Sequence, residues 1–263
     1  MEPGKPDDAA RPGRYARQII LPGFDREGQE RLGRSRVLLL GAGGLGSVCA
    51  QYLVRAGVGS LVLVDNGKVD LPDLNRQLLY VTGDVGEPKA RVAVRLLREI
   101  NPEVRVEGIE EDICKAELPR LVADADVVVD ALDNFPARMM VNEACCRYGK
   151  VLVHGGILGT RGTASVVVPG DGPCLQCMYE AYDLTPPALP LPVLGPTAGI
   201  VGSIQATETL HILLGARPAL LGRLILFNGT SMNFSYRPVK RKLDCSVCRD
   251  VRSASGDSGG RKL

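Results

Sequence analysis

Short apolar runs recur along the first 155 residues, and segments with helical periodicity separate most of them. In one such segment Ala93, Leu96, Leu97 and Ile100 have the spacing of one buried helix face, and Asn101-Pro102 follows as a stop signal. The apolar runs predict buried strands at 37–40, 61–64, 104–109, 127–130 and 151–153. This alternation predicts an α/β fold in which helices cover both faces of a mostly parallel sheet.

The pattern changes after about residue 155. Apolar and polar residues alternate in 163–168, 224–227 and 232–236, and Pro and Gly residues punctuate the intervening sequence. We therefore expect antiparallel strands to extend the sheet in the C-terminal part. The apolar stretch 188–214 is broken by three prolines and contains Gln205, Glu208 and His211, so it predicts a loop and a core helix rather than a membrane span.

Both ends of the chain differ in composition from the middle. Residues 1–14 are polar and proline-rich without an apolar stretch, which predicts a disordered arm rather than a signal peptide. The end of the chain is rich in Gly and Ser, and we expect a flexible tail over 251–263. Between them, 15–250 is expected to form one domain.

Composition narrows the possible partners. A hydrophobic content of 45% over 263 residues supports a buried core, and 32 basic against 30 acidic residues give a formal charge of +2. This balance argues against nucleic-acid binding by bulk charge, and we expect neither a nucleic-acid nor a membrane partner. Eight cysteines without a secretory signal indicate a reducing, cytoplasmic compartment.

A glycine-rich turn follows the first predicted strand. Gly41, Gly43 and Gly46 fit the pattern GxGxxG, in which the first allows a tight turn, the second a close phosphate and the third close helix packing. Asp65 ends the second strand, where a carboxylate can accept both hydroxyls of a ribose. On this motif alone a dinucleotide such as NAD is favoured, and a turn that binds nothing is the alternative.

Three charged residues change that interpretation. Arg76 follows the second strand, Lys89 begins the next helix, and Asp133 lies just past the strand that ends at Asp130. ATP brings about four negative charges and therefore needs cations and usually magnesium. Each residue alone is compatible with a solvated surface charge, but together they predict a site for a triphosphate and magnesium. Asp130 lies closer to the strand, where it can cap or orient.

The chain resembles the ThiF/MoeB/HesA family, the bacterial relatives of the ubiquitin-activating enzymes. The resemblance runs from about residue 14 to 248 and rests on "RYARQI", "GAGGLGS", "LVLVD", "DLNRQ", "VGEPKA", "ALDN" and two CxxC pairs in the family's order. It implies a Rossmann-like fold and an adenylyltransferase. In such enzymes ATP adenylates the C-terminal Gly-Gly carboxylate of a ubiquitin-like sulfur-carrier protein, with release of pyrophosphate, and sulfur comes from a separate donor.

The resemblance also assigns roles to residues. Asp65 would hold the ribose, Arg76 and Lys89 the phosphates, and Asp133 the magnesium ion. Arg17 would reach the γ-phosphate region of a partner subunit, which implies a homodimer. The nucleotide-binding part would cover about 35–155 and the carrier and zinc part about 156–250. The remaining residues expected around the nucleotide are Gly41, Gly43, Gly44, Gly46, Asn75, Gln77 and Asn134.

One position departs from the family pattern. Relatives commonly have Asn where this chain has Asp73. An added carboxylate beside the phosphates would repel ATP unless it points away or helps to hold the metal.

The two CxxC pairs predict a metal site. Cys174 and Cys177 form the first pair, and Cys245 and Cys248 form the second. Four thiolates in two such turns favour tetrahedral structural zinc, which would tie the C-terminal segment back onto the domain. A redox dithiol or unliganded thiols are the alternatives. Most of the other cysteines are expected to be buried packing residues.

Many relatives carry a cysteine in a crossover loop after the first zinc pair. Alignment puts this cysteine near Ala188, but residues 178–194 contain no cysteine. We therefore expect adenylation without a covalent bond between a cysteine of the enzyme and the carrier. Alternatives are adenylation of a small molecule or a modified tRNA base, as in the threonylcarbamoyladenosine dehydratases, and a non-catalytic scaffold subunit. An NAD-dependent oxidoreductase is the last-ranked alternative.

Overall fold

The computed structural model describes residues 13–182 and 192–252. Most of the predicted arm (1–14) and tail (251–263) lies outside these residues. So does the middle of the crossover segment, including Ala188.

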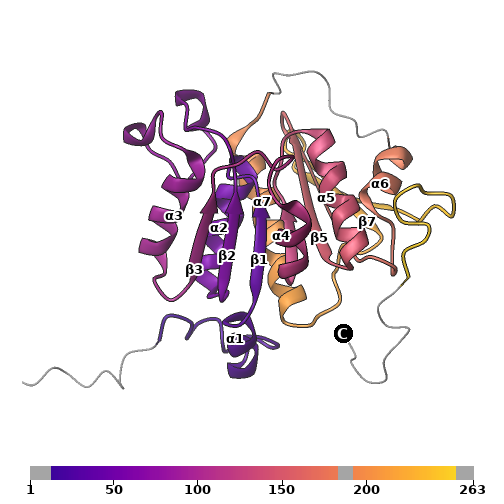
Figure 1. Cartoon of the computed structure of the whole chain (residues 1–263), viewed down its shortest axis with the longest axis horizontal. Helices are drawn as coiled ribbons and strands as arrows, with labels where there is room; N and C mark the ends of the chain where they lie inside the picture. Colours follow the sequence, from indigo (N-terminus) through magenta and orange to yellow (C-terminus); the bar gives the residue numbers. More distant parts are fainter. Residues whose placement is uncertain (1–12, 183–191, 253–263) are drawn as a thin grey trace, which may run out of the picture.

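A single eight-stranded sheet runs through the molecule in the order β3-β2-β1-β4-β5-β6-β7-β8 (Figure 1). Neighbouring strands from β3 to β5 pair in parallel, and those from β5 to β8 pair antiparallel. This confirms the predicted α/β fold with an antiparallel C-terminal extension. The strands are β1 (Arg36–Leu40), β2 (Ser60–Val64), β3 (Arg105–Ile109), β4 (Val127–Asp130), β5 (Val151–Leu158), β6 (Arg161–Val167), β7 (Arg223–Asn228) and β8 (Asn233–Pro238).

Strand β5 is longer than its sequence pattern indicated. Its first residues pair with β4, whereas Leu152–Leu158 also pair with β6. The second half contains two glycines, Gly155 and Gly156, which weaken the apolar signal of a strand. The second half of β5 is therefore a strand because it pairs with β6, although its composition does not favour a strand.

Helices cover both faces of the sheet. Side chains of β1 alternate between two cores: Val37 and Leu39 pack with α2, α3 and α7, and Leu38 and Leu40 pack with α4, α5 and α6. Because both faces are covered, residues 37–40 of this strand form an uninterrupted apolar run. The helices are α1 (Arg26–Leu32), α2 (Gly44–Ala56), α3 (Lys89–Ile100), α4 (Leu118–Asp124), α5 (Phe135–Tyr148), α6 (Leu175–Tyr182) and α7 (Gly195–Leu213), with short 3-10 helices η2 (Leu71–Asp73) and η3 (Thr82–Asp84).

The order of the strands defines where a ligand can bind. The chain passes from β1 to β2 and β3 on one side, and then returns to place β4 on the other side of β1. The chain therefore leaves β1 toward α2 on one face of the sheet and leaves β4 toward α5 on the other face, and a crevice remains between these two connections at this edge. In Figure 1 this edge lies at the top, whereas α1 and the residues before it lie at the bottom.

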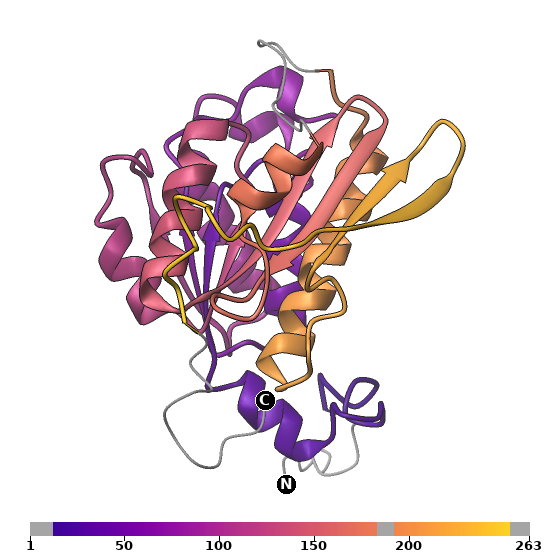
Figure 2. The same cartoon turned by 90° about the vertical axis from the view of Figure 1, so that its right-hand side faces the viewer.

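The C-terminal segment crosses back over the molecule. Strands β7 and β8 form a ribbon that projects from the sheet, and the chain after β8 returns across it (Figure 2). None of the helices in the described part of the chain is long and apolar enough to cross a membrane.

Candidate functional site

A cavity of about 540 Å³ opens at the carboxyl ends of β1, β2 and β4. It is lined by residues from the glycine turn, from the segment after β2, from the start of α3 and from the segment after β4. Nine of the residues predicted from the sequence line it: Gly41, Gly43, Gly44, Asp65, Arg76, Gln77, Lys89, Asp133 and Asn134. The tertiary structure thus brings together residues from Gly41 to Asn134, which are far apart along the chain.

The glycine turn is closed by very short backbone contacts. Gly41 has φ +95°, and a Cβ on it would lie 2.6 Å from the carbonyl oxygen of Ala131. A Cβ on Gly46 would lie 1.9 Å from the carbonyl oxygen of Gly41. Gly43 differs, because the nearest neighbour of a Cβ added there would be the Gln77 Nε2 atom, at 3.8 Å. Gly41 and Gly46 are therefore required by the backbone, whereas Gly43 leaves space on the cavity side.

The N-terminus of α2 faces this space. Gly43 is the N-cap residue, and no side chain caps the helix there. The first backbone N–H groups of α2 are consequently available to an anion in the cavity. This arrangement fits the phosphates of a nucleotide.

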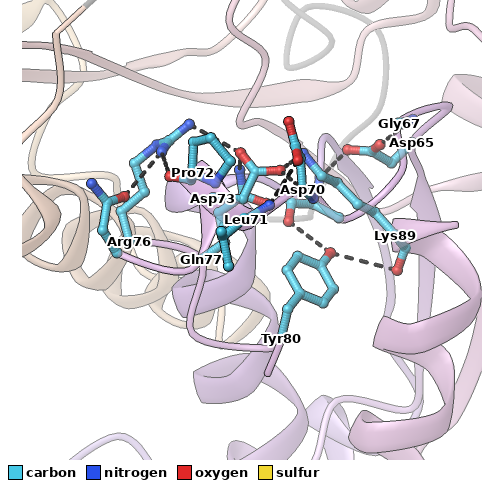
Figure 3. A network of polar contacts seen from close by, with 12 residues as sticks. Asp65, Gly67, Asp70, Leu71, Pro72, Asp73, Arg76, Gln77, Tyr80 and Lys89 are labelled. Atoms are coloured by element: carbon cyan, nitrogen blue, oxygen red, sulfur yellow. Dashed lines mark hydrogen bonds and ion pairs between the residues drawn. The ribbon is translucent and has the colours of Figure 1, made fainter. Parts of the chain in front are cut away.

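Asp65 joins the glycine turn to the segment after β2. One carboxylate oxygen accepts a hydrogen bond from the Ala42 amide and the other from the Gly67 amide, both at 2.7 Å (Figure 3). The side chain is half-buried and lines the cavity. Each oxygen keeps a second lone pair, so the carboxylate can still accept from ribose hydroxyls.

Asp73 lies between the two cations predicted to hold phosphates. Its carboxylate is 3.1 Å from the Arg76 guanidinium and 2.9 Å from the Lys89 ammonium, and it also accepts from Gln77 at 2.7 Å (Figure 3). It does not point away from the site. Asn75 lies outside the cavity lining and accepts from the Arg76 guanidinium at 3.0 Å.

The loop that carries Asp133 is held from behind by buried polar groups. Asp130 accepts from the Leu132 amide at 3.1 Å, and Gln205 donates to the Asp130 carbonyl at 2.7 Å. Arg138 donates to the Leu132 and Gly155 carbonyls. The side chain of Asp133 is exposed at the cavity.

Asn134, the next residue, lines the cavity and caps α5. Its side-chain oxygen accepts from the Ala137 amide at 2.9 Å. The Asn134 side chain therefore fixes the start of the helix as well as lining the site.

Asp130 forms a buried ionic network with Arg138 and His154. Burial alone would raise the pKa of Asp130, but the Arg138 charge and the hydrogen bond from His154 outweigh it and lower this pKa. Burial lowers the pKa of His154, against the opposing effect of Asp130. His154 is therefore a neutral ring that donates from Nδ1 to the ionised Asp130 at 2.7 Å. As the sequence indicated for Asp130, this carboxylate orients the loop instead of lining the cavity.

Arg17 lies at the opposite end of the strands from the cavity of its own chain. It is exposed and is absent from the cavity lining. The neighbouring Tyr15 hydroxyl donates to Glu103 at 2.9 Å and accepts from Asn101 at 2.8 Å, which fixes this segment beside the end of α3. Arg17 can therefore contribute to such a site only in a second copy of the chain.

The four cysteines of the two CxxC pairs converge. Their sulfur atoms all lie within 4.8 Å of one another. Cys174 Sγ is 3.9 Å from Cys177 Sγ and 3.7 Å from Cys245 Sγ, and Cys177 Sγ is 3.7 Å from Cys248 Sγ. A tetrahedral zinc ion with bonds of about 2.3 Å separates its sulfur ligands by about 3.8 Å. The four residues thus fit zinc, and the distances exclude disulfides.

Basic residues near the second pair hold the returning chain. Arg241 donates to the carbonyls of Gly170, Cys248 and Val251. The Lys242 amide donates to Cys177 Sγ at 3.5 Å. Hydrogen bonds that involve backbone groups thus hold the C-terminal segment in addition to the sulfur cluster.

Sequence reasoning missed several residues of the cavity. Glu111, Asp112 and Ile113 line it from the segment after β3, and Arg138 lines it from α5. The first three follow the carboxyl end of a parallel strand, which was a usable signal. Arg138 has no such signal, because it is one of several charged residues on a helix.

Comparison with known proteins agrees with this geometry. A profile of the ThiF family matches residues 15–247. The SAMP-activating enzyme E1 of Haloferax volcanii is 44% identical over 244 residues, which are 92% of this chain and 90% of that protein. The sulfur carrier protein adenylyltransferase of Thermus thermophilus is 42% identical over 248 residues, covering 90% of both.

A third relative is the molybdopterin-synthase adenylyltransferase of Escherichia coli, 37% identical over 239 residues, which are 89% of this chain and 95% of that protein. Among solved structures, E. coli MccB with MccA-N7isoASN shares the fold, with a TM-score of 0.82 and 24% identity over 91% of this chain and 75% of MccB. The fold and the site define a nucleotide-binding enzyme of the adenylyltransferase class. The chain belongs to the ThiF family.

The two kinds of glycine give a direct test of the turn. We expect Gly46→Ala to lower the free energy of unfolding by about 2 kcal/mol or more, because its Cβ would collide with backbone. Gly43→Ala should cost less than about 1 kcal/mol and instead weaken ATP binding. Urea unfolding and ATP titration of both variants separate these effects. An unchanged stability of Gly46→Ala would contradict the geometry.

Proposed function

We propose that this protein uses ATP and magnesium to adenylate the C-terminal Gly-Gly carboxylate of a ubiquitin-like sulfur-carrier protein. The observation that carries the proposal is the cavity itself, in which the glycine turn, Arg76, Lys89 and Asp133 meet at one edge of the sheet of a ThiF-family chain. Relatives named as a sulfur carrier protein adenylyltransferase and a SAMP-activating enzyme support this substrate class.

The chemistry requires orientation and charge neutralisation rather than a base. A carboxylate that attacks the α-phosphate is already ionised, so two anions must be brought together and held in line. The N-terminus of α2 and the cations Arg76 and Lys89 would bind the phosphates, and Asp65 would fix the ribose. Ile113, Ile157 and Val193 supply an apolar part of the lining.

Asp133 is the residue proposed to hold magnesium. Its carboxylate is exposed at the cavity, and an oxygen donor of this kind suits a hard cation. Bound magnesium would neutralise part of the phosphate charge. The buried Asp130–Arg138 network holds the backbone of Leu132, the residue before Asp133.

We also propose a homodimer in which Arg17 reaches the cavity of the partner chain. The position of Arg17 supports this, because its segment contacts the ends of α2 and α3 and Arg17 does not line the cavity of its own chain. The four cysteines would bind structural zinc. A complete set of four sulfur ligands leaves no open position for a substrate on the metal.

The carrier would leave, or react, as the acyl-adenylate, with sulfur supplied by a separate protein. No cysteine occurs in residues 178–194. Cys49, Cys145 and Cys146 are buried, and burial raises the pKa of the Cys49 and Cys145 thiols, which keeps them protonated and unreactive.

The magnesium assignment predicts the behaviour of Asp133→Ala. Loss of the metal ligand should lower carrier-dependent exchange of labelled pyrophosphate into ATP by about 100-fold or more, with the melting temperature unchanged. Asp124→Ala is the control, because Asp124 ends α4 and does not line the cavity. Normal exchange by Asp133→Ala would refute the assignment.

Sharing of sites between two chains predicts complementation. Arg17→Ala alone should be inactive in exchange. Mixed with Asp133→Ala it should recover about one quarter of wild-type activity, since half of the dimers then contain one intact site. A mixture of Arg76→Ala and Asp133→Ala should recover nothing, because both changes lie in the same cavity. Lack of recovery in the first mixture, after demonstrated subunit exchange, would exclude sharing.

Structural zinc predicts about one zinc ion per chain by elemental analysis. Cys245→Ser should lower the melting temperature by about 5 °C or more while affecting exchange less. Cys114→Ser is the matched control, because Cys114 is exposed and outside the cluster. A metal-free protein of full stability would contradict a structural role for the pairs.

Adenylation without a covalent bond between enzyme and carrier predicts a negative result on a gel. Enzyme, carrier, ATP and magnesium should give no thiol-sensitive adduct under non-reducing conditions. Among the eight cysteines, all within the described part of the chain, only Cys114 is exposed. An adduct that maps to Cys49, Cys114, Cys145 or Cys146 would make that cysteine catalytic and overturn this part of the proposal.

A further inference from the structure

The carboxylate of Asp73 is fully engaged by the groups around it. One oxygen accepts from Arg76 at 3.1 Å and from Gln77 at 2.7 Å, and the other contacts Lys89 at 2.9 Å and the Asp70 amide at 3.2 Å. The side chain is 12% exposed, so solvent screens these ion pairs only partly. Arg76 and Lys89 therefore share one negative charge, which offsets about half of their positive charge before any phosphate arrives.

Asp73 is also fixed in place. It is the last residue of η2, and its side chain accepts from the Asp70 amide at the start of that helix in a capping box. Moving the carboxylate away would leave this cap and the buried Gln77 amide without their partner. A bound triphosphate would therefore share Arg76 and Lys89 with Asp73 rather than replace it.

The other charged residues of the cavity also disfavour an anion. Its lining includes three basic side chains, of Arg76, Lys89 and Arg138, and Arg138 is itself paired with Asp130. Five acidic side chains line it as well: Asp65, Asp73, Glu111, Asp112 and Asp133. The lining of one chain is thus net negative, although its proposed ligand is an anion.

A net-negative cavity discriminates between two forms of ATP. Metal-free ATP carries about four negative charges, and ATP with bound magnesium about two. Repulsion by a fixed charge is proportional to the charge on the ligand, so the carboxylate opposes the metal-free form about twice as strongly in free energy. The same carboxylate therefore reduces the affinity for the magnesium complex by a smaller factor.

We propose that Asp73 is a specificity-determining residue that makes this site select magnesium-bound ATP over metal-free ATP. The inference rests on the proposed function, since it requires ATP as the ligand. It assigns to Asp73 a role at the nucleotide without making it a ligand of the metal.

The test is calorimetric titration of ATP, in excess magnesium and in EDTA, into the wild type and Asp73→Asn. Asparagine retains the shape and one oxygen acceptor but removes the charge. Removal of the repulsion should raise the affinity of Asp73→Asn for the magnesium complex about threefold. The repulsion energy is about twice as large for metal-free ATP, so its affinity should rise about tenfold. The selectivity for the magnesium complex should therefore fall about threefold.

Asp84→Asn is the matched control. Asp84 also ends a 3-10 helix, accepts from the amide that begins it, at Val81, and pairs with an arginine, Arg95, but it does not line the cavity. This variant should keep the wild-type selectivity. If Asp73→Asn does not fold, as judged by circular dichroism and melting, Asp73→Ser offers a short oxygen acceptor for the same measurement.

Each alternative outcome has a definite meaning. Equal changes for both forms of ATP, or none, would overturn the inference. Selective loss of binding of the magnesium complex would overturn it too, because Asp73 would then be a metal ligand. A wild type that binds ATP under neither condition would refute the proposed function and the inference with it, whereas the first two results leave the proposed function intact.

Discussion

The close approach of three backbone segments at the carboxyl end of β1 is the constraint on which the site depends. Gly41 lies against the carbonyl of Ala131, and Gly46 lies against the carbonyl of Gly41, at distances that leave no room for a side chain. The start of α2, the end of β1 and the loop after β4 are thereby locked together. The helix N-terminus and Asp133 can face one cavity only because these contacts bring them to the same edge.

The basic side chains at the cavity are paired with carboxylates of the protein itself. Asp130 is ionised and buried with Arg138 and the neutral ring of His154, and this network holds the loop behind the cavity. Asp73 has an analogous role in the cavity lining, where it holds Arg76 and Lys89. Both carboxylates order cations or loops in advance, so less conformational entropy is lost when a ligand binds.

The antiparallel half of the molecule serves a different purpose. The ribbon of β7 and β8 leads the chain away from the sheet, and the four cysteines bring it back against α6. Tyr179 in that helix accepts from Arg138 at 2.9 Å. The sulfur cluster is therefore connected through one helix to the network that holds the Asp133 loop.

Much of the fold was predictable because its signals are local. A parallel strand covered on both faces has a continuous apolar run, as in residues 37–40 of β1 and 127–129 of β4, and a tight turn without room for Cβ atoms must contain glycine, as at Gly41 and Gly46. The CxxC pairs likewise predicted a sulfur cluster, because each pair places two thiolates on one turn. These features depend on residues only a few positions apart.

The tertiary structure decided the contacts between distant segments. Sequence could place Asp73, Arg76 and Lys89 near the phosphates, but which side chain pairs with which depends on how the segment after β2 folds over the start of α3. The same holds for Glu111 and Asp112, which reach the cavity only because β3 lies beside β2. Arg17 is the clearest case. Its sequence motif was evident, but only the folded chain shows that this segment packs against the ends of α2 and α3, and not at the cavity.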